Sequence, residues 1–358
     1  MSLSRWGWNS YFEAMWNEAG SGEDAVPARV VAQHRACWRI AGAFGECLAG
    51  PSGKLRLAAE AGADWPAVGD WVAVEKSGLA DVALVRAVLP RRSQFTRKAP
   101  GRKIEEQVMA ANVETALVIS ALDGDANPRR AERYIAQCWE FGVRPVLILN
   151  KADACENAHE KAAEMERVAL SIPVHIVSAR TGHGLEEVER LLRPGDTLVM
   201  LGSSGAGKST LTNRLLGQAL QKVNEVRASD GRGRHTTTTR ELFALPCGAL
   251  LIDTPGLREL QLWNGEEGLA QTFADIHSLA ERCRFTNCGH QAEPGCAVQA
   301  AVQAGTLPLG RLENQRKLAR EQEFLRRKVD PEARSNEKQR IKRLTREARK
   351  IYQDRKAT

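Results

Sequence analysis

The sequence lacks the features of a membrane or secreted protein. No apolar run approaches the roughly 20 residues that cross a bilayer, and the first residues mix polar and acidic side chains without a small-residue cleavage site. Paired cysteine spacing is also missing, because five of the eight cysteines are scattered, at Cys37, Cys47, Cys138, Cys155 and Cys247. This argues against a disulfide framework, and we expect a cytoplasmic protein that contacts no membrane.

An excess of positive charge is missing outside one end of the chain. The 358 residues carry a formal net charge of +7, but residues 311–358 hold 17 Lys and Arg against 8 Asp and Glu, which leaves the remainder at −2. A basic run often forms only a solvated helix surface, and that interpretation stays open. The alternative is a polyanionic partner, whose phosphates basic side chains would contact. The length itself predicts two or three domains.

The first hundred residues predict an extension and a small barrel. Residues 1–29 contain Trp6, Trp8, Tyr11, Phe12 and Trp16, which are typical of a short docking helix with packing aromatics. Residues 30–105 alternate short apolar stretches with glycine-rich turns, as in PAVGDWVAVE at 66–75. This texture predicts a β-barrel of the oligonucleotide-binding (OB) type, although a barrel that only packs is an equal alternative.

A basic connector leads into a long α/β region. Residues 91–114 are expected to be a linker, either solvated or in contact with phosphates, with basic side chains at Arg91, Arg92, Arg97, Lys98, Arg102 and Lys103. Strands are then predicted at 115–121, 145–149, 173–178, 197–201, 241–245 and 249–253. Helical patterns lie between them at 128–141, 157–170 and 184–192. The alternation predicts a parallel sheet with helices on both faces.

The strongest motif is GSSGAGKST, which follows the apolar strand 197–201 and precedes a helical pattern. Strand, glycine-rich loop and helix form the context of a phosphate-binding loop, with backbone N–H groups and a helix N-terminus directed at phosphate oxygens. Lys208 is expected to reach the outer phosphates and Ser209 to bind Mg²⁺. The predicted nucleotide-binding residues here are Gly202, Ser203, Ser204, Gly205, Ala206, Gly207, Lys208, Ser209 and Thr210.

A second motif predicts which base is bound. The sequence NKAD (Asn150, Lys151, Ala152, Asp153) follows the strand 145–149. A carboxylate there accepts hydrogen bonds from N1–H and the 2-amino group of guanine, which adenine lacks, and such sites discriminate strongly. Ser178 and Ala179 follow the next strand and are predicted to support the guanine.

A third motif, DTPG, ends the strand 249–253. We expect Asp253 to hold Mg²⁺ through water and the Gly256 N–H to sense the γ-phosphate. Before it lies GRGRHTTTTR at 231–240, from which Thr238 is the preferred Mg²⁺ ligand. Leu257 stands where Ras-like enzymes carry a water-orienting glutamine, so hydrolysis is either slow alone or assisted by another group.

A cysteine cluster follows, with the pattern Cys283-x4-Cys288-x-His290-x5-Cys296. Three thiolates and an imidazole make a closed tetrahedral set that suits structural Zn²⁺. The spacing differs from common zinc fingers, so three reduced core cysteines beside a chance histidine remain the alternative. A metal here would stabilise a small domain with little core of its own.

The order of these motifs identifies a resemblance. NKAD precedes the phosphate-binding loop, whereas in Ras-like GTPases it follows. With PAVGDWV, AANVE, GSSGAGKST, RHTTT and DTPG, the chain resembles the circularly permuted, small-ribosomal-subunit-dependent GTPases (RsgA/YjeQ) over nearly its whole length. The resemblance implies one structural Zn²⁺ on the cysteine cluster, Mg²⁺ with GTP, and His235 as the residue that positions water. His235 and Lys208 are the two residues expected to act in catalysis.

The resulting expectation is a GTPase of late small-subunit maturation. We expect an extension (1–29), a barrel (30–105), a permuted GTPase domain (106–275) and a zinc-binding, basic helical domain (276–358). The expected partners are GTP and GDP and the small ribosomal subunit with its rRNA, bound by a monomer in the GTP state and released on hydrolysis; the subunit is implied by the resemblance alone. Two alternatives are a nucleotide-gated RNA-binding module with incidental turnover and an ATP-using enzyme.

Overall fold

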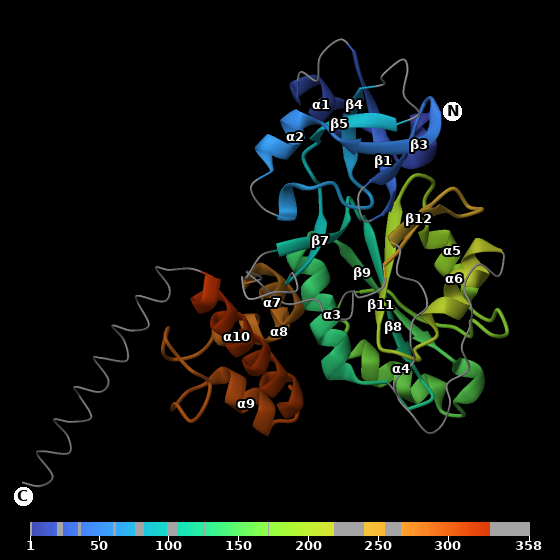
Figure 1. Ribbon diagram of the computed structural model, residues 1–358. Helices are drawn as coiled ribbons and strands as arrows, with labels where there is room; N and C mark the ends of the chain where they lie inside the picture. Colours follow the sequence, from blue (N-terminus) through green and yellow to red (C-terminus); the bar gives the residue numbers. More distant parts are fainter. Residues whose placement is uncertain are drawn as a thin grey trace, which may run out of the picture. The chain divides into compact units, whose positions relative to one another are not determined.

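A computed structural model describes residues 2–19, 24–34, 37–59, 62–75, 82–98, 106–124, 126–170, 172–217, 240–254 and 266–329. The chain divides into two compact units, Met1–Gln261 and Leu262–Thr358, and each is described by itself (Figure 1). Among the described residues, no helix combines the length and the apolar character needed to cross a bilayer.

The first unit contains the predicted barrel. Its strands are β1 (Ala25–Gln33), β2 (Trp38–Gly42), β3 (Gly45–Pro51), β4 (Trp71–Glu75) and β5 (Val82–Val88). They pair in the order β1-β2-β3-β5-β4, and β4 returns to β1, which closes the barrel. Between β3 and β4 lie α2 (Gly53–Ala58) and the short 3₁₀ helix η2 (Gly62–Asp64). The OB-like prediction is therefore confirmed, with β1 beginning at Ala25.

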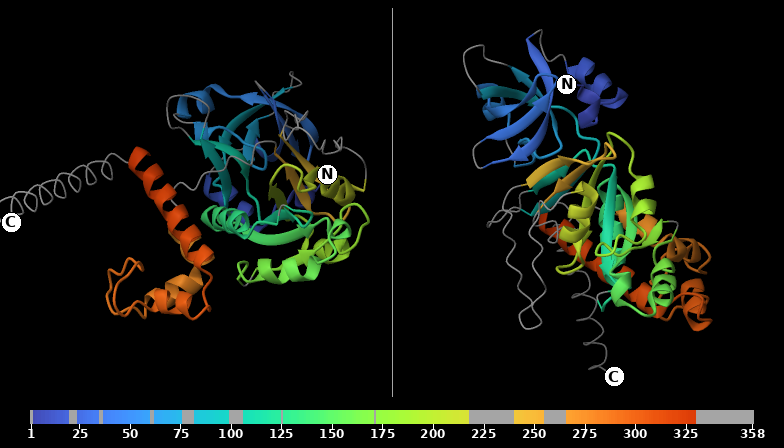
Figure 2. Two further views of the ribbon diagram at one scale, coloured as in Figure 1. Left: turned by 90° about the horizontal axis from the view of Figure 1, so that it is seen from below. Right: turned by 90° about the vertical axis from the view of Figure 1, so that its right-hand side faces the viewer.

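The N-terminal aromatics pack against this barrel. The segment forms η1 (Leu3–Trp6) and α1 (Ser10–Ala19), which lie beside the strands (Figure 2). The Trp71 ring of β4 lies 4.7 Å from the Trp8 ring and 5.8 Å from the Phe12 ring, between ring centroids. Because Phe12 and Trp71 are fully buried, these aromatics serve as core, as the sequence predicted.

The α/β part of the first unit has six strands in the order β10-β9-β8-β11-β13-β12. All pairs are parallel except β12–β13, which is antiparallel, so the expected parallel sheet ends in one reversed strand. The bounds are β8 (Thr115–Ala121), α3 (Pro128–Glu140), β9 (Arg144–Asn150), η3 (Ala152–Ala154), α4 (Ala158–Glu166), β10 (Val174–Ile176), α5 (Leu185–Leu191), β11 (Thr197–Gly202), α6 (Lys208–Leu216), β12 (Arg240–Ala244) and β13 (Leu250–Asp253).

Alternate residues of each central strand enter different cores, as a sheet covered on both faces requires. In β9, Leu147 and Leu149 pack with α3 and α4, whereas Val146 and Ile148 pack with α5 and α6. Figure 1 shows these two pairs of helices on opposite sides of the sheet. The arrangement leaves the carboxyl ends of the strands as the edge where the polar motifs meet.

The barrel and the α/β sheet share β1, whose Ala32 and Gln33 pair with β12. Near this junction the buried Arg29 donates to the carbonyl oxygen of Gly69 at 3.1 Å and to Thr197 Oγ1 at 2.8 Å. Burial lowers the pKa of Arg29 to about 10, so it stays protonated at neutral pH. Barrel and sheet are thus connected by strand pairing and by a buried charge.

The predicted linker at 91–114 is wrong in part, because it contains a hairpin. Strands β6 (Gln94–Lys98) and β7 (Glu106–Ala111) pair antiparallel. The guanidinium of Arg91 donates to both carboxylate oxygens of the buried Asp70, at 2.8 Å each. Arg91 therefore connects the segment before β6 to the barrel residue Asp70. Arg102 and Lys103 lie outside the described residues.

The second unit is helical, with α7 (Glu266–Thr272), α8 (Ala274–Ala280), α9 (Ala297–Gln303) and α10 (Leu309–Val329). Arg311 of α10 donates to Asp275 of α8 at 2.7 Å and is almost fully buried. Leu312 and Leu318 of α10 are buried, whereas the Phe324 side chain is exposed, so the apolar stripe of this helix ends before Phe324. The part of the basic run 311–358 that follows Val329 lies outside the described residues.

Candidate nucleotide and metal sites

The phosphate-binding loop has the backbone that its glycines predict. It connects β11 to α6, and Gly205 and Gly207 adopt left-handed φ angles of 82° and 92°. A Cβ on Gly202 would lie 2.4 Å from the carbonyl oxygen of Ile119, so the neighbouring strand excludes any side chain there. Ser204 and Gly205 face solvent. The loop is therefore narrow, closely packed at its base and open at its tip.

Lys208 is the first residue of α6. Its Nζ donates to the carbonyl oxygens of Gly202 and Ser203, at 2.8 and 2.5 Å, which holds the ammonium within the loop. Ser209 and Thr210 follow in the first turn, where helix N–H groups and the helix dipole favour an anion. This arrangement suits the binding of phosphate oxygens.

Asn150 lies at the carboxyl end of β9 and contacts two loops. Its Nδ2 donates to the Ala206 carbonyl oxygen at 2.9 Å, and its Oδ1 accepts from the Ala179 N–H at 3.0 Å. The side chain is fully buried, and an unpaired buried amide is costly. Asn150 therefore joins the phosphate-binding loop to the loop after β10.

Asp153 follows in the same motif and is held by that second loop. Ser178 Oγ donates to one carboxylate oxygen at 2.5 Å, and Arg180 lies 2.8 Å from the other. The Thr181 N–H donates to Ser178 Oγ at 3.1 Å, which directs the hydroxyl proton at Asp153. The Ser178 hydrogen bond, with the Arg180 charge added, holds the pKa of Asp153 below its usual range. The carboxylate is therefore ionised at neutral pH. The Asp153 side chain is 15% exposed.

Lys151 is fixed by a residue that sequence reasoning missed. It has a left-handed φ of 66°, and its Nζ lies 2.6 Å from the Asp123 carboxylate. Asp123 comes just after β8. Because a strand was predicted at 115–121, the position of this acidic residue at the carboxyl end of that strand could have identified it as a site residue from the sequence. Arg180 and Arg214 were missed as well, because only the folded chain brings them to this edge.

Asp253 ends β13 at the same edge. Because β13 pairs in parallel with β11, with Val199 opposite Ile252, its carboxylate lies at the edge that carries the phosphate-binding loop. Gly256, Leu257, His235 and Thr238 lie outside the described residues. Their predicted roles are untested by the geometry.

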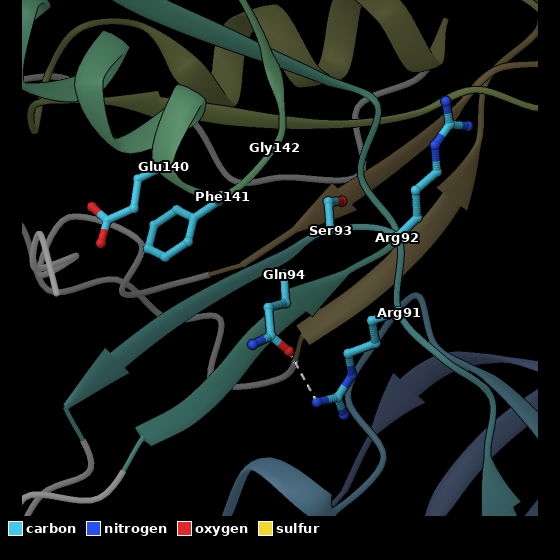
Figure 3. A pocket seen from close by; sticks show the side chains of 7 residues that line it. All are labelled: Arg91, Arg92, Ser93, Gln94, Glu140, Phe141 and Gly142. Carbon is cyan, nitrogen blue, oxygen red and sulfur yellow. Dashed lines mark hydrogen bonds between the residues drawn. The ribbon is translucent and has the colours of Figure 1, made fainter. Parts of the chain in front are cut away.

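A cavity of about 460 Å³ lies away from this edge, at the amino end of β9 (Figure 3). The close-up shows Arg92, Gln94 and Glu140 pointing in different directions rather than at one centre. Gln94 Oε1 already accepts from Arg91 at 3.2 Å. The polar groups therefore converge on no ligand position, and we assign no site to this cavity.

In the second unit the four predicted ligands come together. The ligand atoms of Cys283, Cys288, His290 and Cys296 lie within 4.8 Å of one another. Cys283 Sγ is 3.8 Å from Cys296 Sγ, and His290 Nδ1 is 3.6 and 3.5 Å from those two sulfurs. A tetrahedral Zn²⁺ with bonds of about 2.3 Å to sulfur and about 2.0–2.1 Å to nitrogen places sulfurs about 3.8 Å apart and S and N about 3.6 Å apart. The donor set and its spacing fit zinc.

Local structure presents His290 to the cluster. The residue has a left-handed φ of 58°, and its carbonyl oxygen accepts from Gln299 and Arg316. Burial, followed by the charge of Arg316, lowers the pKa of His290, which favours the neutral imidazole that a metal ligand requires. Cys296 also caps α9, accepting from the Gln299 N–H at 3.4 Å.

Comparisons with a family model, with curated proteins and with solved structures all identify RsgA or YjeQ proteins as similar to this chain. A family model described as RsgA GTPase matches residues 88–263. A "Small ribosomal subunit biogenesis GTPase RsgA" from Opitutus terrae is 45% identical over 100% of this chain and 98% of that protein. One from Syntrophotalea carbinolica is 44% identical over 88% of each. Among solved structures, YjeQ from Thermotoga maritima has a TM-score of 0.62 at 25% identity, over 83% of this chain and 98% of that one. YloQ, a circularly permuted GTPase, has a TM-score of 0.61 at 20% identity, over 84% of this chain and 96% of its own.

Proposed function

The chain belongs to the RsgA GTPase family, and from that membership we propose that it hydrolyses GTP in the late maturation of the small ribosomal subunit. Relatives that align over the whole chain are named for small-subunit biogenesis. The structural observation that carries the GTPase part is the contact of Asn150 with Ala206. This contact supports the proposal, because NKAD lies beside the loop 202–210 although it precedes that loop in the chain.

Each motif has a defined part in nucleotide binding. Asp153 would accept hydrogen bonds from the guanine edge, Ser178 and Ala179 hold the reading residues, and Lys151 would contact the base. The N–H groups of the loop 202–210 and the Lys208 ammonium bind the phosphates and stabilise charge in the transition state. Gly256 contacts the γ-phosphate.

A magnesium ion fits this edge of the sheet because the available donors are oxygens. Ser209, Asp253 and, outside the described residues, Thr238 would hold it. Bound there, Mg²⁺ would neutralise charge on the β- and γ-phosphates. Leu257 cannot orient water, so His235 is assigned that role, and turnover by the protein alone is slow.

The second unit supplies contacts to the partner. One zinc ion held by Cys283, Cys288, His290 and Cys296 stabilises this small unit, whose metal-binding loop has few buried apolar side chains. The basic segment after Arg311 and the barrel contact rRNA phosphates in the GTP state, and hydrolysis releases them. The chain runs from β13 directly into this unit, so one connection can carry the nucleotide state.

Further parts of the proposal rest on the same membership. The small ribosomal subunit stimulates hydrolysis, and the protein acts as a monomer. The protein is located in the cytoplasm, where the small ribosomal subunit matures. The same four parts are proposed, extension, barrel, GTPase domain and zinc-binding domain. The boundary at 105/106 is kept, that at 29/30 moves to just before β1 (Ala25–Gln33), and that at 275/276 moves to 261/262, so that no strand or helix is divided.

A competition assay tests the nucleotide assignment. We expect unlabelled GTP, but not ATP at the same concentration, to displace labelled GDP. In Asp153→Asn the carboxamide N–H is matched to the C2 carbonyl of xanthine, so xanthosine triphosphate should become the better competitor. Displacement by ATP would instead support an ATP-using enzyme. If a variant that binds GTP but does not hydrolyse it is still released from the small ribosomal subunit, this would support the alternative of a nucleotide-gated RNA-binding module with incidental turnover.

A further inference from the structure

Arg214 of α6 contacts the loop that holds the guanine-reading residues. Its Nε donates to the Ala179 carbonyl oxygen at 3.0 Å, and its NH2 group donates to the Arg180 carbonyl oxygen at 2.6 Å. The acceptors are two successive backbone carbonyls, so these bonds constrain the main chain. The rigid fork of an arginine suits such a pair of acceptors better than the single ammonium of a lysine.

The loop at 178–181 also determines where Asp153 and Asn150 lie. Ser178 donates to Asp153, Arg180 pairs with it, and Ala179 donates to Asn150. A shift of the main chain at 179 and 180 would therefore move the partners of both base-reading side chains together.

Arg214 lies on the same helix as the phosphate-binding lysine. Lys208 begins α6, and Arg214 stands in its last turn. Since a helix is rigid over two turns, the position of Arg214 relative to Lys208 is set by the helix itself. One element thus contacts the phosphate-binding loop at its start and the base-reading loop near its end.

We propose that Arg214 is a positioning residue for guanine recognition, which holds the 178–181 loop at a fixed distance from the phosphate-binding end of α6. The inference rests on the proposed reading of guanine by Asp153. It predicts that Arg214 affects how well the base is read more than how well the phosphates are held. Arg214 is solvent-exposed, so its removal leaves no cavity.

The test compares GDP with inosine diphosphate (IDP), which lacks only the 2-amino group that Asp153 accepts from. Dissociation constants for both nucleotides and the GDP release rate are measured for the wild type, Arg214→Met and Arg214→Lys. Loss of two hydrogen bonds predicts GDP release about tenfold faster in Arg214→Met, with the preference for GDP over IDP reduced by a similar factor. Arg214→Lys keeps a single donor nitrogen, so its GDP release rate and its preference for GDP over IDP should lie between those of the wild type and Arg214→Met.

Arg190→Met is the matched control, because Arg190 is an exposed arginine on α5 that pairs only with Glu186 at 3.4 Å in the described structure. It should behave as the wild type. Equal weakening of GDP and IDP in Arg214→Met, or an unchanged preference, would overturn the positioning role alone. A wild type that binds GDP and IDP equally would overturn the assignment of Asp153, and this inference with it.

Discussion

Asn150 Nδ2 donates to the carbonyl oxygen of Ala206 across 2.9 Å, although 56 residues separate the two in the chain. The contact is so close that a Cβ on the adjacent Gly207 would lie 2.2 Å from the same nitrogen. Residue 207 must therefore lack a side chain for two reasons, its φ of 92° and this neighbour. The NKAD motif and the loop 202–210 are therefore packed as one unit.

Gly207→Ala should weaken nucleotide binding. The new methyl group would displace Asn150 or distort the loop, so we expect GDP affinity to fall by more than about tenfold, the effect of 1.4 kcal/mol. Gly45→Ala is the matched control, because Gly45 has a φ of 94° but an open environment. Both variants should lose about 1–2 kcal/mol of unfolding free energy from the left-handed backbone. Titration with GDP and urea unfolding separate the effects, and equal GDP affinities would contradict the prediction.

The secondary structure of the α/β region was predictable because its signals are local. Apolar strands such as 115–121 and helical patterns such as 128–141 are visible in the sequence. Strands β6 and β7 were missed because their basic and polar residues are also typical of a linker. The pairing of β6 with β7 reveals the strand character.

The contacts that position the site were less predictable, since they join distant segments. Nothing near Arg91 in the sequence indicates Asp70 as its partner, and nothing near Arg214 indicates the carbonyl of Ala179. Motif spacing identified the residues expected to touch the nucleotide. The residues that hold them in place depend on tertiary packing, which composition and periodicity do not encode.

Ser178→Ala should change how guanine recognition depends on pH. In the proposed function Asp153 accepts from guanine only when it is ionised, and its lowered pKa keeps it ionised as the pH falls. Removing the Ser178 hydroxyl removes the largest cause of that depression, so the preference for GDP over IDP should disappear at a higher pH than in the wild type. Thr181→Ala is the control, since the backbone N–H of Thr181, not its side chain, contacts Ser178. Identical pH midpoints in the three proteins would contradict this role.

Cys288→Ser should remove zinc and unfold part of the second unit. One lost thiolate opens a closed tetrahedral site, and the binding energy of a structural zinc is also folding energy. Metal analysis after dialysis against a chelator should find about one zinc per wild-type chain and far less in the variant, with a loss of helical circular dichroism. Cys247→Ser, at an exposed cysteine outside the cluster, should keep its zinc. Equal metal content would exclude this site.

His235→Ala should lower turnover while sparing GTP binding. If the imidazole positions the attacking water, its loss should reduce subunit-stimulated kcat by about a hundredfold, with the dissociation constant for GTP unchanged. His159→Ala, at an exposed histidine of α4, is the control for a general effect of removing a histidine. Unchanged stimulated kcat in His235→Ala would rule out the role.

GTP turnover should be slow for the protein alone and much faster with small ribosomal subunits. Leu257 leaves the attacking water without the usual glutamine, so a partner must complete the site or order His235. If the basic residues from Arg311 onward contact rRNA phosphates, stimulation should also weaken as salt rises, because releasing the counterions condensed on RNA is less favourable at higher salt. A chain ending at Val329 should keep its basal turnover and show a smaller salt dependence. Fast basal turnover that subunits leave unchanged would mean that the site is complete by itself, and that the link to the subunit rests on family membership alone.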